Sequence, residues 1–256
     1  MPPQSRRRED RPGVRAWWQR IEPIRALAYF APECDAGLRA TGLRGFWMGY
    51  FAARVAPLGA VGPEVVTATF FNFHPAMVRR SIPDAWTFAL PPQVLQARRV
   101  GAARALRRIL PSVDRAAQAL VPFLRRVVDA ADGSGRALFG ANRELGRADD
   151  PVEDLWQACT CLREHRGDGH LAALTSSGLD GCEALVLFSI SEGLPASMFH
   201  AARGWSSDEW ESALARLEDR GLVRAGNLSP AGLDLRRSIE QSTDDLAWPS
   251  VRCAQR

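Results

Sequence analysis

The chain has 256 residues, 46% hydrophobic and 24% charged, which is enough to bury one large core or two small ones. No apolar run approaches the roughly 18 residues of a membrane span, and the opening MPPQSRRREDRPG lacks the apolar stretch of a signal peptide. All 33 basic residues are arginine. Residues 1–20 contain six arginines and only two acidic residues, Glu9 and Asp10, so this segment accounts for the whole net charge of +4. We therefore expect a cytoplasmic globular protein, outside the membrane, with a disordered Arg-rich tail over 1–20.

Five cysteines are present, and none of them forms a metal or redox motif. Cys159 and Cys161 are separated by one residue, whereas zinc-binding and redox pairs have two residues between their cysteines. An odd number of cysteines without such a motif is typical of reduced thiols in a cytoplasmic protein. We expect buried free cysteines, no metal site and no cofactor.

The first 180 residues show the hydrophobic period of helices, and no segment alternates convincingly as a strand. Helices are predicted over 21–38, 43–55, 63–73, a short stretch from Pro75, 91–110 and 112–130. A further helix begins at Pro151, stops at Gly167 and is followed by a new helix near Gly169. The sequence thus predicts a helical domain over 21–150, then a connector helix with a charged turn over 151–180.

The C-terminal part has a more specific order of elements. Helices are predicted over 181–193, 194–204 and 205–223, followed by a tight hairpin through Gly226-Asn227 and a closing helix. Ser206 or Ser207 is the expected N-cap of the third helix. The predicted fold is mainly α, with a helical N-terminal half and a C-terminal winged helix-turn-helix domain over 181–250 that carries a small β-hairpin.

The stretch RLEDRGLV, the short hairpin and the following LSPAG resemble the winged helix of multiple-antibiotic-resistance-type repressors. Segments along nearly the whole chain, among them EPIRALAYFAPE, GLRGFWMGYFAARVAPLG and RGWSSDEWESALARLEDRGLV, resemble a family of actinobacterial helix-turn-helix proteins of unknown function. The resemblance implies a fold and leaves the mechanism open, because one fold hosts many functions.

Charge argues against DNA binding through the third helix of this domain. Asp208, Glu209 and Glu211 stand at its N-terminal end, where a recognition helix normally meets bases and phosphates. Residues 180–219 contain eight acidic residues against Arg203 and Arg216, whereas phosphate neutralisation requires the opposite sign. The Arg-rich helices at 98–126 could contact nucleic acid, but a solvated charged face is the expected alternative.

The stretch 163–170 is the first candidate site. It reads Arg163-Glu164-His165-Arg166-Gly167-Asp168-Gly169-His170 and lies between two apolar segments in the connector. Histidine titrates near neutrality, nearby carboxylates orient its ring, and Arg163 with Arg166 could clamp an anion. The five-residue spacing of the two histidines does not fit a helical zinc site. The alternative is a solvated turn between two helices.

A second constellation lies in the N-terminal half. Tyr50 and Arg54 are four residues apart and share a helix face, while Asn72 and His74 lie inside the apolar stretch ATFFNFHPAM. Trp47 and neighbouring phenylalanines would form an aromatic wall beside these polar groups. Glu22, in the first helix, is expected to pair with Arg54. The alternative is a core histidine with satisfied hydrogen bonds.

Three functions are compatible with these features. The first is a protein of actinobacterial specialised metabolism that binds a small organic ligand between the helical half and a repurposed winged helix. If it is an enzyme, His170 or His165 would transfer a proton, with Glu164, Asp168 and His74 as further candidates and no redox cofactor. The second is a ligand-responsive transcriptional regulator, and the third is a ligand-sequestering immunity protein. We also expect the two constellations to meet in one pocket.

Overall fold

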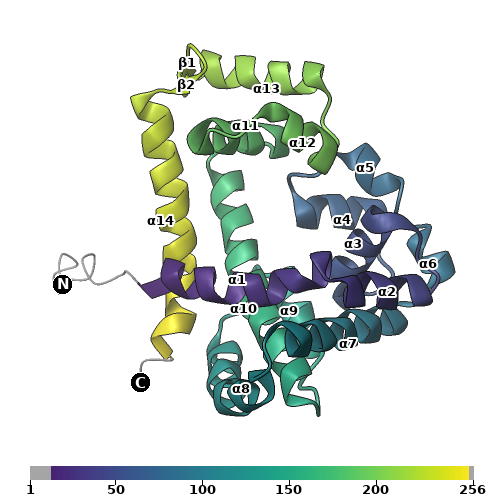
Figure 1. The fold of residues 1–256 in the computed structure, drawn as a ribbon. Coiled ribbons are helices and arrows are strands. Elements are labelled where there is room, and N and C mark those ends of the chain that lie inside the picture. The colour runs from purple at the N-terminus through teal and green to yellow at the C-terminus, as the bar shows by residue number, and fades with distance from the viewer. Residues whose placement is uncertain (1–12, 254–256) are drawn as a thin grey trace.

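A computed structural model describes residues 13–253 and is built almost entirely of helices (Figure 1). The N-terminal half contains α1 (Gly13–Phe30), α2 (Pro32–Ala40), α3 (Gly45–Val55), the 3-10 turn η2 (Ala56–Leu58), α4 (Pro63–Phe70), α5 (Pro75–Arg79), α6 (Ala85–Phe88), α7 (Pro91–Ile109), α8 (Val113–Ala130) and α9 (Ala137–Glu144). The remainder contains α10 (Pro151–Ser176), α11 (Gly181–Glu192), α12 (Ala196–Arg203), α13 (Ser207–Asp219), β1 (Val223–Arg224), β2 (Asn227–Leu228) and α14 (Pro230–Cys253). The mainly α fold with one small hairpin is confirmed.

Helix α10 runs through the centre of the molecule and packs against α1, α7, α8, α9 and α14 (Figure 1). Asp150 caps its N-terminus by accepting hydrogen bonds from the backbone N–H groups of Val152 and Glu153. The helix is buried on most sides, as expected for a helix without a single apolar stripe. Each of its faces therefore contacts a different part of the fold.

The predicted end of this helix at Gly167 is wrong, because α10 continues without a break to Ser176. A Cβ atom on Gly169 would lie 2.6 Å from Nη1 of Arg136 and 3.3 Å from Cβ of Leu246. The missing side chain lets the Arg136 guanidinium approach and donate hydrogen bonds to the carbonyl oxygens of His165 and Leu246. Close approach, rather than helix termination, accounts for this glycine.

The start of the chain also differs from the prediction. Residues 13–20 belong to α1, so they are helical rather than part of a disordered tail, and residues 1–12 lie outside the described residues. The single helix predicted over 21–38 is broken at Ala31, ahead of Pro32, which starts α2.

The C-terminal elements follow the predicted order of helix, helix, helix, hairpin and helix. Ser206 caps α13, because its hydroxyl accepts from the N–H of Glu209 while the Glu209 carboxylate accepts from the N–H of Ser206. The hairpin turn lies at Ala225-Gly226, one residue earlier than predicted, and both residues have positive φ angles, of 49° and 73°. These angles are those of the type I′ turn that joins two-residue hairpins.

In the part of the chain that the structure describes, no single helix is long and apolar enough to cross a membrane. The bent pair α10 and α11, with 101° between them, meets the length and composition criteria together. Cys34, Cys159, Cys161 and Cys182 are free and buried, as predicted, and the side chain of Cys253 lies outside the described residues.

Candidate functional site: a buried arginine cluster around Glu164

The charged stretch at 163–170 lies inside α10 and is buried. The exposed fractions are 2% for Glu164, 3% for His165 and 9% for Arg166. A solvated turn is therefore excluded. Because the stretch is helical, its side chains point to three different faces of α10 instead of converging on one point.

Glu164 faces α1 and α3, where it is surrounded by guanidinium groups. Its Oε1 accepts from Nη2 of Arg25 at 2.6 Å, and its Oε2 accepts from Nη1 of Arg163 at 2.8 Å. Nη2 of Arg54 lies 3.6 Å from the same Oε2. The sequence-predicted pair of Tyr50 and Arg54 is thereby joined to Arg163 and Glu164, so the two predicted constellations meet in part.

Tyr50 completes this cluster from α3. Nη1 of Arg54 donates to Oη of Tyr50 at 3.2 Å. Glu22 contacts Arg163 at 3.4 Å and Arg25 at 3.9 Å, so the predicted pairing of Glu22 with Arg54 is wrong: the partner of Arg54 is Glu164. We call the set formed by Arg25, Arg54, Arg98, Arg163, Glu22, Glu164 and Tyr50 the arginine cluster.

Arg98 approaches this set from α7 and is 3% exposed. It donates to the carbonyl oxygen of Ala53 at 2.6 Å and to Oδ1 of Asn142 at 3.0 Å, so both of these acceptors are neutral. The solvated face predicted for the Arg-rich helices is correct for Arg104 and Arg126 but wrong for Arg98 and for Arg125, which pairs with buried Asp154.

A narrow cavity lies between these side chains and has room for about one water molecule. Its lining comprises Arg25, Ala28, Tyr29, Ala53, Arg54, Arg98, Trp156, Thr160 and Glu164. Three buried polar atoms at or beside it lack a hydrogen-bond partner among the described residues: Oη of Tyr29, Nε of Arg54 and Nε of Arg98. Buried polar groups are normally satisfied, so these atoms mark a place for a further polar group.

The electrostatics of the cluster are dominated by positive charge. Burial alone would raise the pKa of Glu164, but the guanidiniums of Arg163, Arg25 and Arg54 hold it well below its usual range. Burial lowers the pKa of Arg25 to about 9, since its surroundings do not fully compensate its charge. Four arginines face two carboxylates, which leaves an uncompensated positive charge in a largely buried place.

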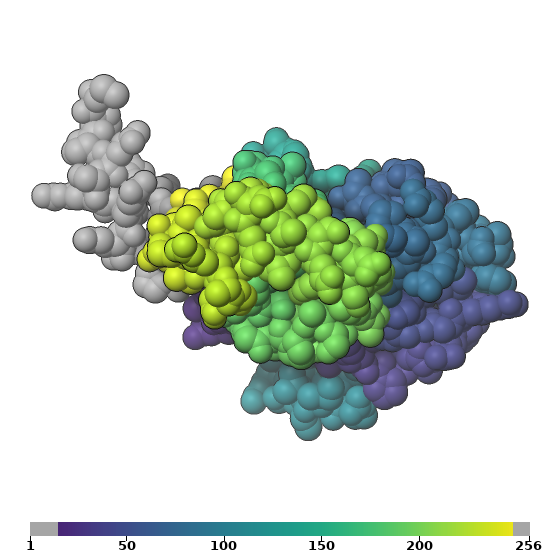
Figure 2. All heavy atoms as spheres, turned by 90° about the horizontal axis from the view of Figure 1, so that it is seen from above, coloured from purple at the N-terminus to yellow at the C-terminus, as the bar shows by residue number. Residues whose placement is uncertain are grey.

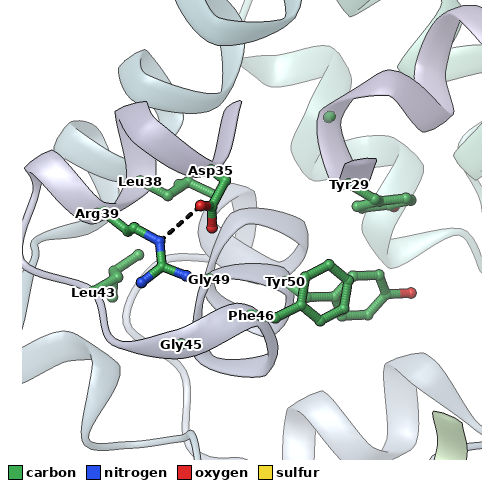
Figure 3. Close-up of a pocket in the computed structure, with 10 residues that line it drawn as sticks. Tyr29, Asp35, Leu38, Arg39, Leu43, Gly45, Phe46, Gly49 and Tyr50 are labelled. Atoms are coloured by element: carbon green, nitrogen blue, oxygen red, sulfur yellow. Dashed lines mark hydrogen bonds and ion pairs between the residues drawn. The ribbon is translucent and has the colours of Figure 1, made fainter. Parts of the chain in front are cut away.

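An aromatic wall surrounds Tyr50 on one side of the cluster. Tyr50 lies 4.7 Å from Tyr29 and 5.6 Å from both Trp47 and Phe73, measured between ring centroids. A second narrow cleft lies on the outer side of this wall, between α1, α2 and α3, with Tyr29, Phe46 and Tyr50 on one side (Figure 3). Ala28 and Tyr29 line both the outer cleft and the inner cavity, and Tyr29 is the larger side chain of the two.

The other charged residues of α10 face elsewhere. His165 contacts the carbonyl oxygen of Asp132 at 3.2 Å, and burial lowers its pKa to about 4. Asp168 accepts from the N–H of Phe139 at 2.9 Å, and burial raises its pKa to about 6. These two groups tie α10 to the loop after α8 and to the start of α9, and they do not reach the arginine cluster.

Arg166 and His170 face α14. Arg166 bonds to Asp244 at 2.9 Å and to Glu240 at 3.2 Å, so it does not form a clamp with Arg163. Nδ1 of His170 lies 2.9 Å from Oγ1 of Thr243, whose own hydroxyl donates to the carbonyl of Ile239. His170 is therefore the donor, and burial lowers its pKa to about 4.

His74 and Asn72 belong to a contact between the two halves of the molecule. Nδ1 of His74 accepts from the N–H of Ala76, so its Nε2 donates to Glu209 of α13 at 2.9 Å. The indole of Trp205 donates to the carbonyl of Asn72 at 2.9 Å, and the N–H of His74 donates to the carbonyl of Arg203 at 2.8 Å. Seen from above, the yellow-green winged-helix elements lie directly beside the blue α4 and α5 (Figure 2).

Sequence reasoning missed Arg25, Tyr29 and Arg98 as members of the site. Arg25 follows Glu22 by three residues within an otherwise apolar helical stretch, which is the one signal that could have indicated it. Arg98 has no such signal, because it is one of several arginines in the same helical stretch. Within residues 13–253, no group of three or more His, Cys, Asp or Glu side chains could hold a metal ion.

The order α11, α12, α13, hairpin and α14 defines a helix-turn-helix domain with a wing attached to a larger helical body. A model of a helix-turn-helix family matches residues 14–255, which is nearly the whole chain, and the chain belongs to that family. No curated protein and no solved structure matches the chain.

Proposed function

We propose that this protein binds a small organic anion at the arginine cluster. The observation that supports this function is the surplus of guanidinium groups: Arg25, Arg54 and Arg163 share one fully buried carboxylate, Glu164. Arg98, buried beside them, bonds only to neutral acceptors. An uncompensated buried charge costs several kcal/mol, so an arrangement of this kind is typical of a site that receives a counter-charge. Arginine is also the side chain that best binds carboxylates and phosphates.

The surroundings favour a ligand with an apolar body. The aromatic wall provides the apolar surface typical of small-molecule sites, in which a few polar groups fix the orientation. The inner cavity has room for about one water molecule, so ligand entry requires a side chain to move. Tyr29 is the proposed gate, because it lines both the inner cavity and the outer cleft, the latter drawn in Figure 3.

Binding of simple carboxylates tests this function. We expect calorimetry to show binding of acetate and benzoate, and no binding of uncharged benzyl alcohol. Arg54→Gln should weaken benzoate binding about 10- to 150-fold, because a hydrogen bond to a charged group contributes about 1.5–3 kcal/mol. The matched control is Arg79→Gln, at an exposed arginine that pairs with Glu64 on the surface. Equal binding of benzoate and benzyl alcohol, or no binding of any carboxylate, would contradict the proposal.

A role in specialised metabolism, and chemical conversion of the bound ligand, are further proposals that go beyond anion binding. Proton transfer by His165 or His170 is less well supported than simple binding, because both side chains face away from the cluster. A sequestering protein would use the same site, and product analysis with a pathway intermediate separates an enzyme from a binder.

The second candidate is a DNA-binding regulator, and membership of the helix-turn-helix family favours it. Two observations oppose it. Asp208 and Glu211 of α13 are exposed, as expected, and Arg216 is engaged with Asp180 and Glu183. The N-terminal end of α13 is also held against α4 and α5 by the His74–Glu209 contact. Fluorescence anisotropy with duplex DNA at low salt tests whether the protein binds DNA, because electrostatic binding is strongest at low salt.

A further inference from the structure

Tyr50 is the member of the arginine cluster that could be either neutral or ionised in the observed geometry. Its Oη accepts a hydrogen bond from Nη1 of Arg54 at 3.2 Å. No acceptor for the proton of Oη is found among the described residues. A guanidinium that donates to a phenol oxygen favours the ionised form of the phenol, because a hydrogen bond between charged partners is the stronger one.

The charges that face Tyr50 come from every element packed around it. Helix α1 contributes Glu22 and Arg25, α3 contributes Arg54, α10 contributes Arg163 and Glu164, and α12 contributes Arg203. Both carboxylates are already engaged with these arginines. The guanidinium of Arg203 lies 4.6 Å from the centre of the Phe73 ring, which itself packs against Tyr50.

The balance of these effects shifts the pKa of Tyr50 downward. Burial alone would raise the pKa of Tyr50, but the guanidiniums of Arg54, Arg25, Arg163 and Arg203 lower it below its ordinary value. The effect is reciprocal, because Tyr50 contributes to raising the pKa of Arg54. A phenolate here supplies part of the negative charge that the arginines lack.

We propose that anion binding at the arginine cluster is coupled to the protonation of Tyr50. At a pH above the midpoint of Tyr50, its phenolate serves as the counter-charge of the empty site. When a carboxylate binds, Oη of Tyr50 takes one proton from solvent, forms an O–H bond and donates a hydrogen bond to the ligand. This inference rests on the proposed function, and it predicts a ligand that binds as an anion together with one proton.

The composition of the chain makes the first test direct, because Tyr29 and Tyr50 are its only two tyrosines. We expect the ultraviolet absorbance of tyrosinate to show one ionisation below the ordinary pKa of about 10. Tyr50→Phe should remove this ionisation and Tyr29→Phe should keep it. Arg203→Gln should move the midpoint upward, whereas Arg79→Gln, at an exposed arginine, should leave it in place. Titration of both tyrosines at or above pH 10 would overturn the proposal.

The second test measures the proton itself. Benzoate binding is followed by calorimetry in two buffers of different ionisation enthalpy, at a pH above the measured midpoint of Tyr50. We expect uptake of up to one proton per benzoate by the wild-type protein and none by Tyr50→Phe. By linkage, affinity should fall up to tenfold per pH unit above that midpoint.

The outcomes separate the two proposals. Benzoate binding without proton uptake would overturn the coupling and leave the anion-binding function standing. A low Tyr50 midpoint with no binding of acetate or benzoate would overturn the proposed function, and the coupling with it. Proton uptake that disappears in Tyr50→Phe while benzoate still binds supports both.

Discussion

Replacing Glu164 with Gln is expected to lower the free energy of unfolding by about 3–5 kcal/mol, the cost of removing one partner from a buried ion pair. Glu164 is the only fully buried carboxylate among the described residues of the arginine cluster, and it bonds to Arg25 and Arg163. Gln keeps the size and one acceptor oxygen but leaves three guanidiniums without their shared counter-charge. Urea unfolding followed by circular dichroism gives the measurement.

Glu64→Gln is the matched control for this change. Glu64 pairs with Arg79 through two well-exposed side chains, and such pairs contribute at most about 1 kcal/mol. The pH dependence gives a second readout. Because the pKa of Glu164 lies below its usual value in the folded protein, its contribution is present above about pH 4.5 and is lost as the pH falls further. The difference between wild type and variant should therefore shrink on acidification. A loss below 1 kcal/mol at pH 7 would contradict this account of the cluster.

The fold could be predicted from local patterns because most of its helices carry their own signals. Ser206 with Glu209 marks the start of α13 in the sequence, and Pro151 after Asp150 marks the start of α10. The error at Gly167 and Gly169 arose where a local signal competes with tertiary packing. In a sequence, a glycine indicates the end of a helix. The close approach of Arg136 to Gly169, which the sequence does not reveal, explains why this glycine lies inside a continuous helix.

The site could be predicted only in part, for a related reason. Tyr50 and Arg54 share one helix face, and Glu164 stands out in a charged stretch, so these residues were found. Arg25 lies 139 positions from Glu164, its hydrogen-bond partner, and no local pattern links them. The histidines were predicted as site residues because their side chains titrate near neutrality. In the structure, the helical geometry of α10 directs His165 and His170 to two faces away from the arginine cluster.

Gly181→Ala is expected to loosen the contact between the winged-helix domain and α4–α5. A Cβ atom on Gly181 would lie 2.2 Å from the carbonyl oxygen of Phe71 and 3.1 Å from Cα of Asn72. Both are backbone atoms, so α11 has to move away, and overpacking of this kind costs about 1–3 kcal/mol. The matched control is Gly140→Ala in α9, where an added Cβ meets nothing within 4 Å.

Hydrogen exchange measures this loosening, because the N–H of His74 is held by the carbonyl of Arg203 across the contact. We expect faster exchange at His74 in Gly181→Ala and unchanged exchange in Gly140→Ala. The same variant distinguishes two reasons why α13 would not bind DNA: its docking against α4–α5 and its negative charge. If docking alone kept α13 from a duplex, Gly181→Ala would bind DNA at low salt where the wild type does not. We expect neither protein to bind, because Asp208 and Glu211 stay on the surface of α13 after undocking and repel phosphate.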